Sequence, residues 1–156
     1  MRIAIISVSS KQPDWVQSGF TDYARRMSGS CRLELKEIPL ARRGASRPLP
    51  RLIEAEGERM LAAVPKGARI VALDEGGQAL RTAQLAVKLE DWMRLGQPTA
   101  LLIGGPDGLA PACLEQAAER WSISPLTLPH GLVRVIVAEA LYRAWSLREG
   151  HPYHRA

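Results

Sequence analysis

Apolar residues along this chain follow two patterns that alternate from one end to the other. Short runs rich in aliphatic residues predict five strands, at residues 3–8, 32–38, 70–73, 99–103 and 121–123. Between them, apolar positions three or four residues apart predict helices at residues 13–28, 53–64, 82–95, 111–120 and 132–148. Strands that alternate with helices are typical of an α/β fold with a mostly parallel sheet and helices on both faces.

Proline, glycine and polar residues mark the boundaries of these elements. Pro13 can be the first residue of a helix, Thr82 can cap another at its amino end, and Gly96 can end that second helix. Residues 74–78 predict a turn, and residues 40–51 predict a basic loop that glycine and prolines keep from being regular throughout.

The best candidates for a binding site follow three predicted strands. In open parallel sheets, ligands bind where the loops at the carboxyl ends of the strands converge. These are the loops after Leu73, Ile103 and Ile123. The second loop has the sequence GGPDG at 104–108, in which glycine lets a ligand approach the backbone. It matches neither G-x-G-x-x-G nor the P-loop, so it is either a plain turn or a cofactor site of another kind.

Length and composition indicate an ordinary soluble protein. A chain of 156 residues fits one domain, 1–156, and its hydrophobic fraction of 46% and charged fraction of 24% are close to globular averages. Without a signal peptide or a membrane-spanning run, we expect it in the cytoplasm. Cys31 and Cys113 lie far apart in sequence, so we expect reduced cysteines and no metal.

The charge of the chain leaves two interpretations open. A net charge of +5 and a pI near 9.7 favour a polyanionic partner, with nucleic acid as the leading candidate. Most of the basic residues are arginine, however, and a GC-rich genome produces arginine without any functional demand. The basic loop contains four of them, Arg42, Arg43, Arg47 and Arg51.

The carboxyl-terminal part of the chain holds three further ambiguous features. The last predicted helix is apolar on nearly all sides, so it is either buried centrally or packed against a second copy of the chain. The tail HPYHRA at 151–156 carries groups suited to proton transfer and RNA contact, but it is also where a terminus frays. His130, at a helix start, is either a structural cap or an active-site group.

Several motifs closely resemble the ribosomal RNA large subunit methyltransferase H family. They are LLIGGPDGL at 101–109, LTLPH at 126–130, EALYRAW at 139–145 and HPYHR at 151–155, with PDWV at 13–16 and EAEGE at 54–58. The likeness therefore covers essentially the whole chain. The family belongs to the SPOUT class, so the resemblance implies a carboxyl-terminal trefoil knot, which periodicity does not indicate.

The resemblance also implies a reaction. Family members use S-adenosylmethionine to methylate N3 of pseudouridine 1915 in helix 69 of 23S rRNA, in the assembled ribosome, and work as homodimers. The positions that match their cofactor-binding residues lie in the three loops found above. These are Leu73, Gly104, Gly105, Ile123, Ser124, Pro125, Leu126, Thr127 and Leu128.

Catalytic and RNA-binding roles are hypotheses at this stage. We expect the tail of one protomer to reach the cofactor pocket of the other, with His154 and Tyr153 assisting deprotonation or base placement, and Arg143 and His130 orienting the uracil-like ring. The candidates for rRNA phosphate contacts are Arg25, Arg26, Arg42, Arg43, Arg47 and Arg155.

Three other functions compete with this one. The chain could be a SPOUT enzyme acting on transfer RNA, or a ribosome-binding factor without turnover. A plain nucleotide-binding domain ranks last, because the chain lacks a phosphate motif.

Overall fold

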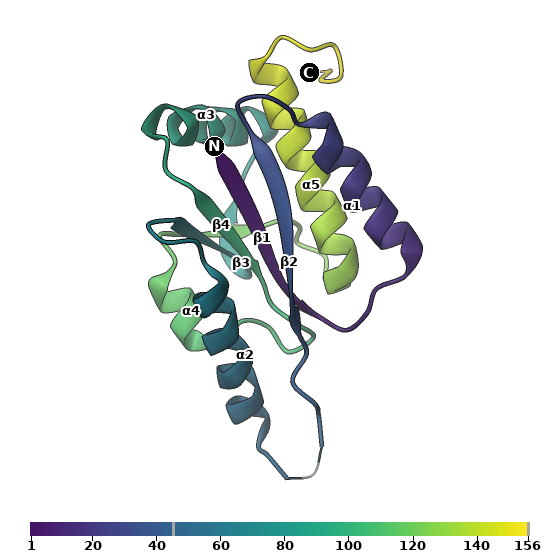
Figure 1. Cartoon of the computed structure of the whole chain (residues 1–156), viewed down its shortest axis with the longest axis vertical. Coiled ribbons are helices and arrows are strands. Elements are labelled where there is room, and N and C mark those ends of the chain that lie inside the picture. The colour runs from purple at the N-terminus through teal and green to yellow at the C-terminus, as the bar shows by residue number, and fades with distance from the viewer. Residues whose placement is uncertain (45, 156) are drawn as a thin grey trace.

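The computed structural model describes residues 1–44 and 46–155, and a five-stranded sheet lies at its centre (Figure 1). The strand order is β2-β1-β4-β3-β5, and the four neighbouring pairs are parallel. The strands are β1 Arg2–Ser9, β2 Arg32–Pro39, β3 Arg69–Ala79, β4 Thr99–Ile103 and β5 Glu119–Ser122. The helices are α1 Asp14–Arg26, α2 Leu49–Ala63, α3 Thr82–Leu95, α4 Pro111–Gln116 and α5 His130–Arg148.

Both faces of the sheet are covered, because the central strands β1 and β4 are buried at every position except Arg2. Ile3 and Ile5 of β1 point to one core, which α1, α3 and α5 cover, whereas Ala4 and Ile6 point to the other, under α2 and α4 (Figure 1). The predicted fold class is therefore confirmed. The half-buried strand β2 lies at an edge of the sheet.

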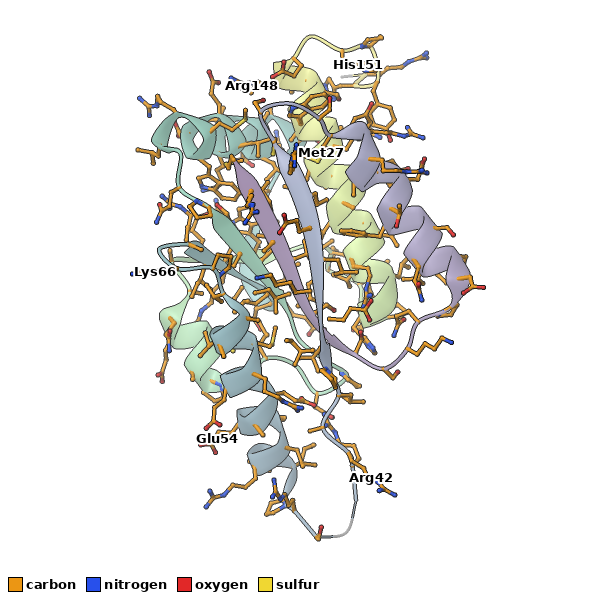
Figure 2. All side chains as sticks on the ribbon, viewed as in Figure 1. Met27, Arg42, Glu54, Lys66, Arg148 and His151 are labelled. Atoms are coloured by element: carbon orange, nitrogen blue, oxygen red, sulfur yellow. The ribbon has the colours of Figure 1, made fainter. Side chains whose placement is uncertain are left out.

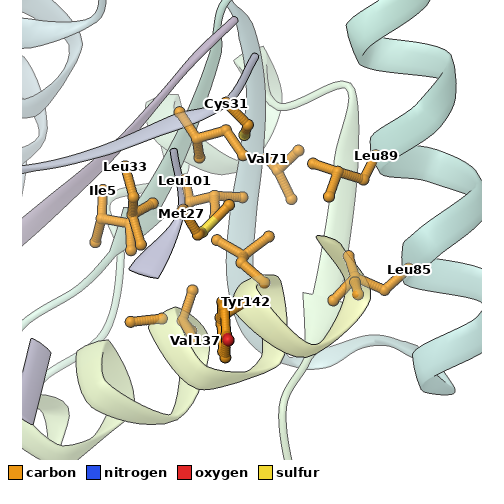
Figure 3. Packing of buried hydrophobic residues seen from close by; sticks show 14 of the residues in the cluster. Ile5, Met27, Cys31, Leu33, Val71, Leu85, Leu89, Leu101, Val137 and Tyr142 are labelled. Carbon is orange, nitrogen blue, oxygen red and sulfur yellow. The ribbon is translucent and has the colours of Figure 1, made fainter. Parts of the chain in front are cut away.

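The larger core gathers side chains from elements far apart in sequence. Figure 3 shows Val137 and Tyr142 of α5 facing the strands and Leu89 of α3 beside Val71 of β3. Helix α5 packs against both α1 and α3. This packing fixes the direction of α5, which begins at the carboxyl end of the sheet and runs back to its amino end (Figure 1).

Several predicted boundaries need correction. Helix α2 begins at Leu49, within the predicted basic loop, because a proline in the first turn of a helix loses no hydrogen bond. Helix α5 begins at His130, α4 ends at Gln116, and the residue that caps α3 is Arg81 instead of Thr82.

The predicted turn at 74–78 also needs correction. These residues belong to β3, but their pairing with β5 is interrupted: Leu73 and Gln78 both lie opposite Trp121, and the residues between them bulge out. Strand β5 itself begins at Glu119, two residues before the predicted start, and ends at Ser122, so Ile123 follows the strand.

Candidate active site

A cavity of about 470 Å³ opens at the carboxyl ends of β3, β4 and β5. Its walls are the start of the β3 bulge, the loop after β4, the segment after β5 and the first turn of α5. Cavities of this size accommodate small molecules and cofactors. The three loops that the sequence singled out therefore converge on one site.

The glycine-rich loop forms a closed turn that contributes three glycines, together with Pro106 and Asp107, to the cavity lining. The N–H of Gly108 donates to the carbonyl of Gly105 over 3.0 Å, and Gly108 has a φ of +85°, which favours glycine. A Cβ on Gly104 would lie 2.6 Å from the carbonyl carbon of Gly108. Only glycine fits at 104, so no side chain covers the backbone there.

The segment after β5 is shaped by short-range hydrogen bonds. The hydroxyl of Ser124 accepts from the N–H of Leu126 over 2.9 Å, and the hydroxyl of Ser122 donates to the carbonyl of Ser124 over 3.3 Å. This turn presents the side chain of Leu126, which is 72% exposed although apolar. Beneath it, Trp121 is buried and stacks on Trp92 of α3 at a centroid distance of 5.5 Å. The wall formed by this segment therefore has a closely packed aromatic base and an apolar rim.

All but one of the predicted cofactor-binding residues line this cavity. Pro125 is the exception, since it is exposed and outside the lining. The residues in the lining are Leu73, Gly104, Gly105, Ile123, Ser124, Leu126, Thr127 and Leu128.

Three carboxylates in the lining were missed by the sequence reasoning. Asp74 and Glu75 lie in the β3 bulge, and Asp107 lies in the glycine-rich loop. Their position in the strand-end loops was the signal that could have found them. Carboxylates beside apolar walls and open peptide groups suit a ligand that carries positive charge as well as an apolar part, and S-adenosylmethionine fits that description.

His130 lies at the cavity as the first residue of α5. Its Nε2 atom is buried and has no hydrogen-bond partner among the residues the structure describes. Burial, reinforced by the charge of Arg134 one turn further along the helix, lowers the pKa of His130. The imidazole is therefore neutral at neutral pH and able to accept a proton or a hydrogen bond.

The other predicted catalytic residues lie away from the cavity of their own chain. Arg143 follows His130 by thirteen residues of helix, or roughly 20 Å at 1.5 Å per residue. Figure 2 shows His151, at the start of the tail, at the end of the molecule opposite to Arg42, which follows the carboxyl end of β2. Within one chain, the fold does not bring Arg143, Tyr153 and His154 to the cavity.

The tail is ordered by contacts with α5. The hydroxyl of Tyr153 donates to Oε1 of Glu139 over 3.0 Å, and Nε of Arg143 donates to the same oxygen over 2.8 Å. The ring of Tyr153 lies 4.6 Å from that of Tyr142. Burial, together with Glu139, raises the pKa of Tyr153, so this phenol stays protonated at neutral pH. The interpretation of the tail as frayed is not supported by these contacts.

The predicted RNA-binding arginines fall into two groups at opposite ends of the molecule. Arg25, Arg26 and Arg155 lie near the tail, where Arg26 pairs with Asp22 over 2.8 Å and lies over the ring of Tyr23. Arg42 and Arg47 are exposed on the loop after β2.

Arg43 differs from these, because the N–H groups on both edges of its guanidinium form ion pairs. It pairs with Glu56 over 2.8 Å and with Asp107 over 2.9 Å. Hydrogen bonding to Glu56 raises the pKa of Arg43. The two carboxylates neutralise its charge within the protein.

Residues 1–44 and 46–155 contain neither a metal-binding cluster nor a membrane-spanning helix. No three or more histidine, cysteine, aspartate or glutamate side chains gather there in a way that could hold a metal ion. No helix in this part of the chain is long and apolar enough to cross a membrane.

Comparisons with known proteins agree with this geometry. A family model described as a predicted SPOUT methyltransferase matches residues 1–154. Ribosomal RNA large subunit methyltransferase H of Thioalkalivibrio sulfidiphilus (strain HL-EbGR7) is 54% identical over 155 residues, which is 99% of this chain and 99% of that protein. These two matches confirm the resemblance that the motifs indicated.

Two solved structures share the fold at low sequence identity. A probable methyltransferase from Bordetella pertussis Tohama I aligns with a TM-score of 0.55 at 15% identity, over 91% of this chain and 95% of that one. A probable methylase family protein from Haemophilus influenzae Rd KW20 aligns with a TM-score of 0.53 at 12% identity, over 99% of this chain and 70% of that one. At such identities the likeness supports the fold alone.

Proposed function

Because the chain belongs to the SPOUT methyltransferases, and among them to the ribosomal RNA large subunit methyltransferase H family, we propose that it methylates 23S rRNA with S-adenosylmethionine as methyl donor. The proposed target is N3 of pseudouridine 1915 in helix 69, in the assembled ribosome. The observation that carries this proposal is the cavity at the carboxyl ends of β3, β4 and β5, whose walls contain almost all the residues matched to the family's cofactor site. The chain works in the cytoplasm and needs no metal.

The cavity supplies the groups that such a donor requires. Peptide groups of the Gly104–Gly108 turn and of the segment 123–128 hydrogen-bond its polar parts, while Leu73, Leu126 and Leu128 cover its apolar parts. The carboxylates of Asp74 and Glu75 offset its positive charge. When bound, the donor supplies a methyl group on a positively charged sulfur, which is already a strong electrophile.

The protein's remaining task is to place the uracil ring and remove its N3 proton. A neutral His130 lies in the cavity wall and orients the ring. Tyr153 stays protonated, so it assists base placement instead of deprotonation, and His154 is the candidate that receives the proton. Arg143 holds the ring beside them.

These tail residues act on the cavity of a second protomer in a homodimer. One observation favours this arrangement: within its own chain, the tail lies at the end of α5 far from the cavity. Leu132, Val135 and Ile136 of α5 are only half-buried, and Trp15 of α1 is 60% exposed, which leaves apolar surface for a partner. The carboxyl-terminal trefoil knot of the family is part of the same proposal, with 1–156 as one domain.

Contacts to rRNA phosphates come from the exposed arginines, which are Arg25, Arg26, Arg42, Arg47 and Arg155. Counterion release makes such binding weaker as salt increases. Ribosome affinity that did not change between 50 and 200 mM salt would contradict this part of the proposal.

The test is transfer of labelled methyl groups to intact ribosomes, free large subunits and bulk transfer RNA, with the product mapped by mass spectrometry. We expect label on the large-subunit pseudouridine in intact ribosomes. Label on transfer RNA alone would keep the chemistry and replace the substrate, and no label anywhere would favour a binding factor without turnover. A His154→Ala variant that binds cofactor but transfers no methyl group would support the role of His154, whereas full activity would exclude it.

A further inference from the structure

Arg43 joins the loop after β2 to the glycine-rich wall of the cavity. Its Nη1 donates to Oε2 of Glu56 over 2.8 Å and to the carbonyl of Ala41 over 2.7 Å. On its other side, Nη2 and Nε donate to Oδ2 of Asp107 over 2.9 and 3.3 Å. One guanidinium therefore bridges α2 and the turn at 104–108.

The α2 end of this bridge is rigid. The side chain of Glu56 is only 3% exposed, and its Oε2 also accepts from the backbone N–H of Ala41 over 2.9 Å. A buried carboxylate needs a paired cation to offset its lost hydration, and bidentate pairing with arginine is the strongest form of that contact. Glu56 thus fixes the guanidinium in place.

Close packing beside the bridge ties the same two regions together. A Cβ on Gly57 of α2 would lie 2.4 Å from the Cβ of Ala110, just after the glycine-rich loop. A Cβ on Gly105 would lie 3.2 Å from Cδ1 of Leu40. The turn is held against α2 and the loop before it by both apolar and ionic contacts.

We propose that Arg43 is a positioning residue for cofactor binding: it holds Asp107, and through it the Gly104–Gly108 turn, in the shape that forms one wall of the cavity. This inference rests on the proposed function. It also assigns Arg43 a role other than the phosphate contact predicted from its sequence, because its charge is already matched by two carboxylates. The neighbouring Arg42 and Arg47 remain available for phosphate contacts.

The test compares binding of S-adenosylhomocysteine by calorimetry in Arg43→Ala, Asp107→Ala and the double variant. Asp107→Ala is the safer of the single changes for folding, because it leaves the buried pair of Arg43 and Glu56 intact. We expect each single variant to bind at least about tenfold more weakly, and the double variant to bind no more weakly than Arg43→Ala, because residues that act as one unit are not additive. Arg43→Lys should recover only part of the affinity, since lysine cannot bridge two carboxylates in a fork.

Arg59→Ala is the matched control. Arg59 lies on the same helix α2 and is exposed, and among the described residues its side chain has one hydrogen bond, to the carbonyl of Ala55 in its own helix. Its removal changes the charge equally and should leave the affinity unchanged. Steady-state kinetics give a second readout, in which the KM for S-adenosylmethionine should rise in Arg43→Ala while the KM for ribosomes stays constant.

Three results would overturn the inference. A rise in the KM for ribosomes alone would make Arg43 an RNA contact. A lower melting temperature with unchanged cofactor affinity would make the bridge purely structural. Additive losses in the double variant would mean that Asp107 acts on the cofactor independently of Arg43. If the wild type binds cofactor but methylates no rRNA, only the proposed substrate fails; if it binds no cofactor, both proposals fail.

Discussion

Gly104 occupies a position where the backbone leaves no room for a side chain. The atoms that a Cβ would meet are all main-chain atoms, among them the carbonyl oxygen of Gly108 at 2.8 Å and the nitrogen of Leu109 at 2.8 Å. Gly104→Ala should therefore force the turn open, cost about 1–3 kcal/mol of stability and weaken binding of S-adenosylhomocysteine at least about tenfold. Calorimetry and thermal unfolding measure the two effects.

The neighbouring Gly105→Ala provides the comparison. Its methyl group would meet side chains, Leu40 at 3.2 Å and Val8 at 3.3 Å, which can shift. The loss should be smaller than at 104, and equal losses at both positions would contradict the argument from backbone contact.

Arg134 is a fully buried charge with incomplete pairing. Its Nη2 donates to the hydroxyl of Ser9 over 2.6 Å, and Nη1 lies 3.5 Å from a carboxylate oxygen of Glu37, but neither Nε nor Nη1 has a hydrogen-bond partner among the described residues. Arg134→Ala should destabilise the protein by about 2–5 kcal/mol through lost volume. Arg134→Met, which fills most of that volume, should cost less than about 1.5 kcal/mol.

Urea unfolding of both Arg134 variants measures this difference. A methionine variant as unstable as the alanine variant would show that the buried charge itself, with its contacts to Ser9 and Glu37, stabilises the fold.

Helix α5 connects the two halves of the proposed mechanism, because it begins at the cavity and ends at the tail. Its amino end also affects the pH dependence of stability. The folded-state pKa of His130 lies below the ordinary value of 6.5, and the positive end of the helix dipole disfavours protonation there as well. The unfolded chain binds the proton more readily. The contribution of neutral His130 to stability is therefore fully present above pH 6.5 and is lost as the pH drops toward the folded-state pKa.

Unfolding by urea at pH 7.5 and 5.5 tests this element. The wild type should lose more stability than His130→Gln on acidification, because the variant lacks the group that takes up the proton. His151→Gln is the matched change at an exposed histidine outside the cavity, and it should behave as the wild type does. Identical pH profiles for the wild type and His130→Gln would remove His130 from the acid response.

At the scale of the whole molecule, the separation of cavity and tail makes a prediction about mixed dimers. Gly104→Ala damages the cavity and His154→Ala damages the tail, so each variant alone should transfer methyl groups at least about tenfold more slowly when S-adenosylmethionine is limiting. If the tail serves the partner's cavity, a heterodimer has one site with both parts intact. Co-expression of the two variants with different tags should then recover about a quarter of wild-type activity, since about half of random dimers are mixed and one of their two sites is complete.

The amount of recovered activity shows whether a tail serves the cavity of its partner or the cavity of its own chain. No recovery after purification of confirmed heterodimers would mean that each tail serves its own chain, and the proposal of a shared site would be wrong.

Local patterns in the sequence were enough to predict the α/β class, the parallel sheet and the location of the candidate cavity. These features follow from local rules. The spacing of apolar residues distinguishes strands from helices, and the carboxyl ends of parallel strands lie at one edge of the sheet. The glycine-rich loop and the segment 123–128 could be found in this way, and the family motifs specified the ligand. Boundaries were less accurate where tertiary contacts overrode local signals, as in the β3 bulge opposite Trp121.

The pairing of charged groups, by contrast, is visible in the three-dimensional structure alone. Arg43 and Asp107 are 64 residues apart. The sequence of a basic loop does not show whether its arginines face solvent or a carboxylate. The distance of Arg143, Tyr153 and His154 from their own cavity likewise depends on the direction in which α5 packs between α1 and α3. Such pairings are set by the path of the whole chain, since side chains distant in sequence come together only when the sheet and its helices assemble.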